Sequence, residues 1–204
     1  MPVPVIRRYR PEDRAAVFDI CVRTAEAGGD ARGIYRDWDV LANNFAAPYT
    51  VLEPDLAFVL DDGTGQPVGY VLGTSDTGRF VREFREKWLP EVAGRHPLPA
   101  GEPVTPDEVM AALLHRPERM IVPELADYPA HLHIDLLPEF QGRGHGRNLL
   151  ATLFAALADA GAARVHLGMV TANTAARGFY DRMGFHEIPV ADAGVLTYLG
   201  RSTG

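Results

Sequence analysis

The pattern Gln-x-x-Gly-x-Gly at residues 141–146 is the part of this sequence whose residue types and spacing best fit a chemical task. The residues before it, His131 to Leu137, alternate as a strand does, and a run with helical spacing follows from Asn148. Glycine lets a backbone approach a ligand closely, and the free amides and dipole at a helix start attract an anion. The segment therefore predicts a phosphate-binding loop that joins a strand to a helix.

The spacing of these glycines separates three kinds of phosphate-binding loop. A Walker loop would close with Gly-Lys-Ser/Thr, and a dinucleotide loop would read Gly-x-Gly-x-x-Gly, whereas this chain reads Gly-x-Gly-x-Gly. The pattern resembles the pyrophosphate loop of the GNAT superfamily of N-acetyltransferases, in which Gln/Arg-x-x-Gly-x-Gly/Ala follows a strand and opens a helix. A glycine-rich turn without a ligand is the alternative interpretation of so short a motif.

A second segment resembles the same superfamily. Residues 164–170 predict a strand, and residues 173–185 predict a helix with an asparagine N-cap and a glycine C-cap. The superfamily's second signature, Asn-x-x-Ala-x-x-Phe-Tyr followed by Gly-Phe, is matched at Asn173, Ala176, Phe179, Tyr180, Gly184 and Phe185. The two motifs stand in the expected order, so they reinforce each other.

The rest of the chain resembles a narrower group, the acetyltransferase-like C-terminal domain of eukaryotic protein O-GlcNAc hydrolases. The resemblance lies in the hairpin pattern of residues 55–74 and in the C-terminal residues 195–202. That eukaryotic domain is regarded as a pseudo-acetyltransferase without a proper cofactor loop, whereas Gln141, Gly144 and Gly146 are present here. We therefore expect a stand-alone, bacterial-type domain that binds a cofactor and has no glycosidase activity.

The resemblance implies acetyl-CoA as the cofactor. The amides near Leu136 and Leu137 would bond the pantetheine and the thioester carbonyl if the strand splays there, and the loop amides would bond the pyrophosphate. The cofactor-binding residues implied in this way are Leu136, Leu137, Gln141, Gly142, Arg143, Gly144, His145, Gly146, Arg147, Asn173, Ala176, Phe179 and Tyr180. Asn173 can act as a helix cap only or also contact pantetheine, and both roles stay open.

Acetyl transfer also needs proton donors and acceptors. The resemblance places Tyr180 as the general acid that protonates the leaving thiolate, and a core tyrosine is the alternative. His131, His133 and Asp135 share one face of a strand. The superfamily's usual base positions fall nearer to residues 130 and 132, neither of which can take a proton. We predict Asp135 as the catalytic partner of Tyr180 if a bulge shifts the register, with His133 as an alternative.

The same strand also allows simpler roles for its polar side chains. The face can be merely polar, a water chain can lead to a distant carboxylate, or catalysis can proceed without a base. A zinc site is not expected, because the histidine pair has no third ligand at a recognisable spacing.

Composition favours one soluble catalytic domain over residues 1–204. The chain has 204 residues, 47% of them hydrophobic, and a net charge of -7, which disfavours nucleic-acid or anionic-membrane partners. The single cysteine, Cys21, is typical of a core thiol and excludes an internal disulfide. The N-terminus has no signal-peptide pattern and no apolar run reaches the ~18 residues of a membrane span, so we expect a cytoplasmic protein.

The predicted elements fit an α/β fold of the acetyltransferase type, with a mixed, mostly antiparallel sheet splayed between its fourth and fifth strands. We expect a strand at residues 3–8, a helix at 11–26, a hairpin at 57–74, a helix at 78–90, and an inserted stretch of short helix and loop up to residue 129. The predicted function is acetyl transfer to a primary amine, carried by a small molecule or a peptide, in a monomer or homodimer. A catalytically silent module that binds acetyl-CoA or a peptide is the alternative, and a longer acyl donor is a second one.

Overall fold

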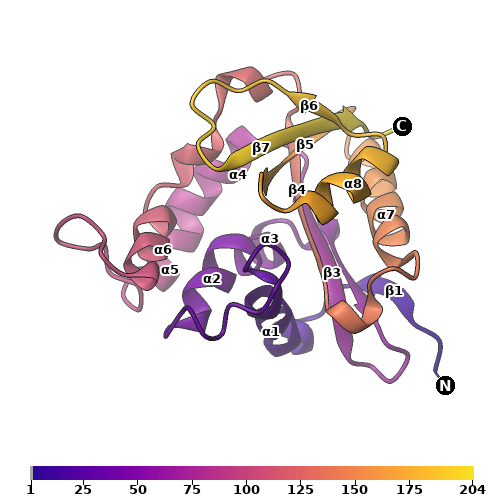
Figure 1. Cartoon of the computed structure of the whole chain (residues 1–204), viewed down its shortest axis with the longest axis horizontal. Helices are drawn as coiled ribbons and strands as arrows, with labels where there is room; N and C mark the ends of the chain where they lie inside the picture. Colours follow the sequence, from indigo (N-terminus) through magenta and orange to yellow (C-terminus); the bar gives the residue numbers. More distant parts are fainter. Residues whose placement is uncertain (1) are drawn as a thin grey trace.

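The computed structural model describes residues 2–204 and forms one seven-stranded sheet with helices on both faces (Figure 1). The sheet order is β1-β2-β3-β4-β5-β7-β6, and every neighbouring pair is antiparallel except β4 and β5. The strands are β1 (Val5–Arg8), β2 (Ala57–Asp61), β3 (Pro67–Thr74), β4 (Ala130–Leu136), β5 (Arg164–Val170), β6 (His186–Ile188) and β7 (Leu196–Ser202). The predicted mixed, mostly antiparallel α/β sheet is confirmed.

The helices divide between the two faces of the sheet. The set α1 to α6 lies to the left of the central strands in Figure 1, whereas α7 and α8 lie to the right. Their bounds are α1 (Arg14–Thr24), α2 (Trp38–Phe45), α3 (Ala47–Leu52), α4 (Thr77–Glu83), α5 (Leu89–Val92), α6 (Pro106–Leu114), α7 (His145–Asp159) and α8 (Thr174–Arg182). One-turn 3-10 helices occupy Pro11–Asp13, Pro54–Leu56, Pro117–Met120, Pro123–Leu125 and Pro138–Phe140.

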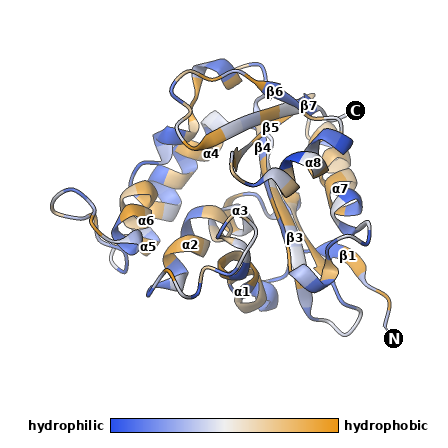
Figure 2. Ribbon diagram, viewed as in Figure 1, coloured by the Kyte–Doolittle hydropathy of each residue, from blue (hydrophilic) through white to orange (hydrophobic). Residues whose placement is uncertain are grey.

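The core forms where the central strands meet these two helical layers. All residues of β2 and β3 are buried; α7 packs against both strands, and α1 and α3 also pack against β3. The helix α7 turns a leucine-rich stripe toward the sheet, formed by Leu149, Leu150, Leu153 and Leu157. Figure 2 shows this distribution, with hydrophobic colouring on the central strands. The most completely buried apolar side chains therefore lie on and against the central strands, and they hold in place the part of the sheet that carries the candidate site.

The sheet opens between β4 and β5. These two parallel strands pair only at Ala130 with Val165 and at His131 with His166. On its other side β4 pairs with β3 over six residues, from His131 to Leu136. The edge of β4 that faces β5 therefore loses its ladder after His131, which confirms the predicted splay between the fourth and fifth strands.

Several element boundaries differ from the sequence-based expectation. The first strand begins at Val5 instead of residue 3, and the first helix begins with the 3-10 turn Pro11–Asp13. The single helix expected at 78–90 is interrupted by a π-helical turn at Phe84–Trp88 between α4 and α5. The strand β6 was not expected, because three residues are too short to show a period. Within residues 2–204, we find no helix with the length and apolar character needed to cross a bilayer.

Candidate functional site

The loop after β4 has the backbone geometry of an anion-binding turn. Gly142 and Gly144 have φ angles of 70° and 85°, a left-handed conformation that glycine adopts without strain. A Cβ on either glycine would meet nothing within 4 Å, so backbone conformation and not crowding calls for glycine here. The Gln141 side-chain amide donates to the Leu136 carbonyl at 2.8 Å and closes the loop onto the end of the strand.

The helix α7 begins directly after this loop. Gly144 is its N-cap residue and supplies no side-chain acceptor, so the amides of the first turn receive no side-chain cap. The helix runs for 15 residues, long enough for its dipole to add to the attraction for an anion. Arg143 and Arg147 are exposed beside these amides. The end of the helix therefore offers backbone donors and positive charge at one place.

The third glycine of the motif has a different role. Gly146 lies within α7, and a Cβ there would come within 3.2 Å of Phe179 Cζ on α8. Real Cβ contacts are seldom so short, so glycine allows α7 and α8 to pack closely. The sequence pattern alone did not reveal this packing role.

The two backbone amides expected at the end of β4 are not equivalent. The Leu137 amide donates to the Val68 carbonyl of the neighbouring segment at 3.0 Å. Bonding alternates along an antiparallel pair, so the amide of Leu136 points the other way, toward β5 and the splay. The expectation that both amides face a ligand therefore needs correction, because only that of Leu136 points into the opening.

The second motif forms the opposite wall of the opening. Asn173 Oδ1 accepts a hydrogen bond from the Ala176 amide at 3.0 Å, which confirms the predicted N-cap of α8. Gly184, with a φ of 79°, follows the helix and confirms the predicted C-terminal glycine. The Nδ2 atom of Asn173 lies 3.5 Å from where a Gly28 Cβ would stand. The loop after α1 therefore closes near the start of α8.

Tyr180 presents a phenol without a partner. Its ring is 9% exposed and packs against the rings of Phe179 and Phe185 at centroid distances of 5.3 and 5.5 Å. Its hydroxyl forms no hydrogen bond within residues 2–204, yet it is not among the fully buried polar atoms that lack partners. Burial, with a smaller contribution from the charge of Asp135, raises the pKa of Tyr180. The phenol therefore stays protonated at neutral pH and is open to a ligand.

On the other face of β4, two histidines belong to a hydrogen-bonded chain. The Thr77 hydroxyl lies 2.8 Å from the Pro129 carbonyl and 2.7 Å from His131 Nδ1. The Tyr49 hydroxyl lies 2.7 Å from His131 Nε2 and 3.1 Å from His133 Nε2. One face of β4, the helices α3 and α4 and the loop before β4 thus share one polar network inside the molecule.

The chemistry of these groups fixes the direction of each bond. A carbonyl only accepts, so Thr77 donates to Pro129 and its oxygen accepts from Nδ1–H of His131. The Nε2 atom of His131 then accepts from Tyr49, whose oxygen accepts from Nε2–H of His133. His133 is left with an unprotonated Nδ1. This atom has no hydrogen-bond partner within residues 2–204 and is accessible to solvent.

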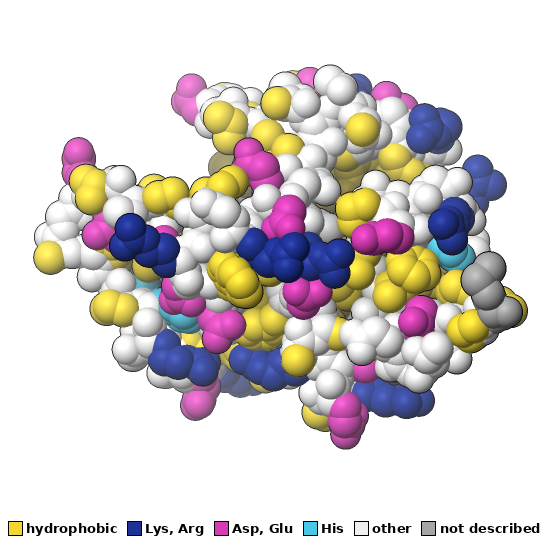
Figure 3. Space-filling model, turned by 60° about the horizontal axis from the view of Figure 1, so that its bottom comes forward, with side chains coloured by type: hydrophobic (Ala, Val, Ile, Leu, Met, Phe, Trp, Pro, Cys, Tyr) yellow, Lys and Arg dark blue, Asp and Glu magenta, His cyan; other side chains and the backbone are white. Residues whose placement is uncertain are grey.

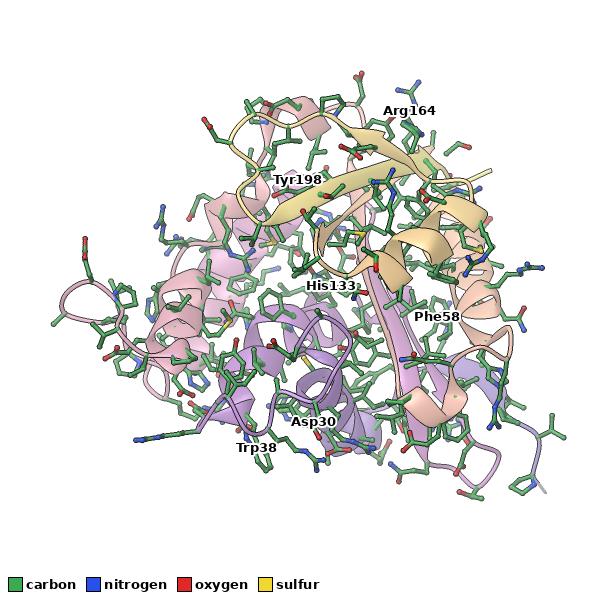
Figure 4. The ribbon with its side chains drawn as sticks, viewed as in Figure 1. Asp30, Trp38, Phe58, His133, Arg164 and Tyr198 are labelled. Atoms are coloured by element: carbon green, nitrogen blue, oxygen red, sulfur yellow. The ribbon has the colours of Figure 1, made fainter. Side chains whose placement is uncertain are left out.

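Burial keeps these histidines neutral. It lowers the pKa of His133 to about 4, with smaller contributions from Arg119 and His166. It also lowers the pKa of His131, and the neighbouring histidines add to that effect. His133 is therefore a neutral side chain with a free lone pair in the central strand of the sheet, where Figure 4 places it.

Asp135 lies two residues further along the same face. Its Oδ2 atom accepts a hydrogen bond from the Tyr70 hydroxyl at 2.6 Å. Burial raises the pKa of Asp135, and the hydrogen bond from Tyr70 opposes this effect. The predicted catalytic carboxylate is thus held between β3 and α1, while its charge is felt at Tyr180.

Three residues to which the sequence assigned no role in the site lie in a chain of neighbours that begins at His133. The Phe45 ring is 5.9 Å from that of His133, and the Arg119 guanidinium carbon lies 5.6 Å from the Phe45 centroid. Tyr198, from β7, lies against Gly168 of β5, whose Cβ would come within 3.2 Å of its ring. Their separation in sequence leaves no local signal, and only the fold brings them together. Figure 4 shows Tyr198 on the strand above His133.

Comparisons with known proteins agree with this geometry. The Acetyltransferase (GNAT) family matches residues 107–185. Protein O-GlcNAcase of Rattus norvegicus and that of Mus musculus are each 26% identical over 188 residues, which are 91% of this chain and 20% of theirs. This chain therefore spans about a fifth of the length of those curated relatives.

Solved structures extend the comparison. The crystal structure of SsHAT is 66% identical, with a TM-score of 0.97 over 100% of both chains. A putative acetyltransferase from Salmonella typhimurium, solved with its cofactor acetyl-CoA, is 16% identical, with a TM-score of 0.56 over 99% of this chain and 95% of that chain. The second likeness is one of fold alone. The 66% identity to SsHAT over the whole chain, together with the family match over residues 107–185 and the two signatures, shows that the chain belongs to the GNAT family of acetyltransferases.

Proposed function

We propose that this protein is an acetyl-CoA-dependent N-acetyltransferase that acts on a primary amine. The observation that carries the proposal is the open edge of β4, which leads from the uncapped start of α7 to the free hydroxyl of Tyr180. One end of this opening suits phosphate, and the other holds groups that can move protons. The family supports acetyl transfer in general, whereas the amine acceptor is our inference.

The residues that line the opening fit acetyl-CoA. Amides of residues 142–147 would hold its pyrophosphate, because the positive-φ glycines leave the loop free of side chains where an anion would approach. The amide of Leu136 and the Nδ2 atom of Asn173 are the donors available further along. When bound, acetyl-CoA supplies an acetyl group activated as a thioester.

Two side chains handle the protons in this proposal. His133 takes a proton from the acceptor amine at Nδ1, the one ring nitrogen that its network leaves free. Tyr180 donates a hydrogen bond toward the leaving sulfur. Its raised pKa lies above the ~8.5 of an ordinary thiol, so it stabilises the thiolate by hydrogen bonding more than by complete proton transfer. Asp135 is the competing base.

We further propose a small-molecule or peptide acceptor and a cytoplasmic setting, with no nucleic-acid partner. The net charge of -7 supports this choice, and on the face shown in Figure 3 basic side chains are interspersed with acidic ones. A silent acetyl-CoA-binding module is the second candidate, and the resemblance to part of the O-GlcNAcases favours it.

Ligand-linked stability and turnover test the proposal together. Saturation with acetyl-CoA at a hundred times its Kd should stabilise the fold by roughly 2.7 kcal/mol. Calorimetric titration, thermal unfolding and thiol release over a panel of amines provide the measurements. If acetyl-CoA produces no binding heat and no shift in thermal unfolding, cofactor binding is refuted. Binding without turnover on any amine would favour the silent module.

A further inference from the structure

Arg119 is a half-buried cation without a counter-charge. It lies in the 3-10 turn Pro117–Met120 of the inserted segment, and no carboxylate of residues 2–204 lies within 4.0 Å of its guanidinium. Its one protein hydrogen bond runs from Nε to the Leu113 carbonyl at the limiting distance of 3.5 Å. Neither terminal nitrogen has a hydrogen-bond partner within residues 2–204, and both are accessible to solvent.

Among the other partly buried arginines of the described chain, most have hydrogen-bond acceptors for their guanidinium groups. Arg7, Arg23 and Arg79 form ion pairs. Arg201 donates to two backbone carbonyls. Arg14 stacks over Phe18 at 4.2 Å on the outer surface of α1. Arg119 differs because its free donors stand beside the candidate catalytic group.

Aromatic side chains and the candidate base lie around Arg119. The Phe45 ring centroid lies 5.6 Å from the Arg119 guanidinium carbon and 5.9 Å from the centroid of the His133 ring. The charge of Arg119 also acts on Tyr49 and Tyr198, which come from α3 and β7. All of these except Tyr49 are partly exposed, although His133 lies in the central strand of the sheet. Each of these partly exposed side chains is therefore reached by solvent.

We propose that Arg119 binds a carboxylate of the acceptor, so that the acceptor is an amino-carboxylic acid whose amine lies at His133. A guanidinium whose face rests on an aromatic ring keeps its edge free, and that edge matches a carboxylate in a two-point hydrogen bond. The common contact with Phe45 places the two groups close enough for one small molecule to reach both. This inference rests on the proposed acetyl transfer.

The test compares acceptors that differ only in the carboxylate. Linear ω-amino acids from glycine to 6-aminohexanoate are assayed against their amides, with thiol release giving kcat/KM. We expect at least a tenfold preference for the acid at one chain length, expressed mainly in KM. Arg119→Met keeps the stem on Phe45 and should remove that preference while acetyl-CoA affinity stays unchanged. Arg119→Lys should retain part of it, since it keeps the charge but loses the two-point bond.

Arg116→Met is the matched control, because it changes an exposed arginine three residues earlier and should preserve the preference. Equal rates for acids and amides, or a preference that survives in Arg119→Met, would overturn the proposal. If no amine is acetylated, the proposed activity fails, but the carboxylate site can still be tested by itself. The test is then a titration of 6-aminohexanoate into the protein in the presence of acetyl-CoA. Binding that Arg119→Met abolishes supports the carboxylate site, and an absence of binding refutes it.

Discussion

The two sides of the opening between β4 and β5 are built from different materials. The proposed cofactor side consists mainly of backbone groups, in the loop of residues 141–146, the first turn of α7 and the edge of β4, with the Asn173 side chain added from the start of α8. The acceptor side consists of side chains from distant segments, with Phe45, Arg119, His133 and Tyr198 each from a different element. The first half therefore comes mostly from one continuous stretch, β4 to α7, whereas the fold brings the residues of the second half together from four separate elements.

This difference indicates which of the two sides tolerates amino-acid substitutions. Backbone donors depend on conformation, so the cofactor side is sensitive at glycines and insensitive to the identity of most exposed side chains. Side-chain groups can be exchanged without moving the backbone, so the acceptor side is where relatives of one fold can diverge. Variants that act on only one half can test this division.

The largest effect should come from Gly144→Val on the cofactor side. Valine is strained at a φ of 85°, and the loop amides would turn away from the pyrophosphate. Hydrogen bonds to a charged group contribute about 1.5–3 kcal/mol each, so losing two of them should weaken acetyl-CoA binding by about 10²- to 10⁴-fold. Calorimetric titration measures the loss.

Gly161→Val is the matched control for this variant. Gly161 lies just beyond the other end of α7, with a φ of 82° and equally open surroundings. Both variants should lose similar stability, but only Gly144→Val should lose the ligand. Normal acetyl-CoA binding by Gly144→Val would place the phosphates elsewhere.

On the acceptor side, His133→Gln should lower kcat by roughly 10²- to 10³-fold. Glutamine can still donate to Tyr49, as Nε2–H of His133 does, but it has no basic nitrogen. Asp135→Asn is the companion variant, because it keeps an oxygen for the Tyr70 hydroxyl and removes the charge. A larger loss in Asp135→Asn than in His133→Gln would make Asp135 the base.

Tyr180→Phe should have a smaller effect, roughly 10²-fold in turnover, the low end for general acid catalysis. Phenylalanine preserves the packing against Phe179 and Phe185 and removes only the hydroxyl. Acetyl-CoA affinity should change little, so kcat and not KM carries the loss. Equal turnover by the variant would mean that Tyr180 is structural.

The same division explains what the sequence could predict. The positive-φ glycines of the loop and the Asn173 cap act within a few residues, so their spacing is visible along the chain. The splay of β4 and β5 was expected only through the resemblance to a known family. Arg119, Phe45 and Tyr198 lie far apart in sequence, and no local pattern marks them. The packing of Gly146 on Phe179 also depends on how α7 and α8 meet.

The smallest predicted effect is a pH dependence of stability that belongs to the acceptor side. The folded pKa of His133 is about 4, below the unfolded value of about 6.5, so the unfolded chain binds more protons between these two values. The stability is therefore present above about pH 6.5 and declines as the pH falls toward 4. Lowering the pH from 7 to 5 should cost about 2 kcal/mol from this residue.

Urea unfolding at pH 7 and pH 5 measures this cost. His133→Gln should reduce the difference between the two pH values, whereas His186→Gln, at an exposed position on β6, should leave it unchanged. Acetyl-CoA affinity should vary less over this range, because the cofactor side binds through amides that do not titrate. If His133→Gln retains the full pH dependence of stability, the neutral histidine network does not cause it. The pH dependence would then not be a property that separates the acceptor side from the cofactor side.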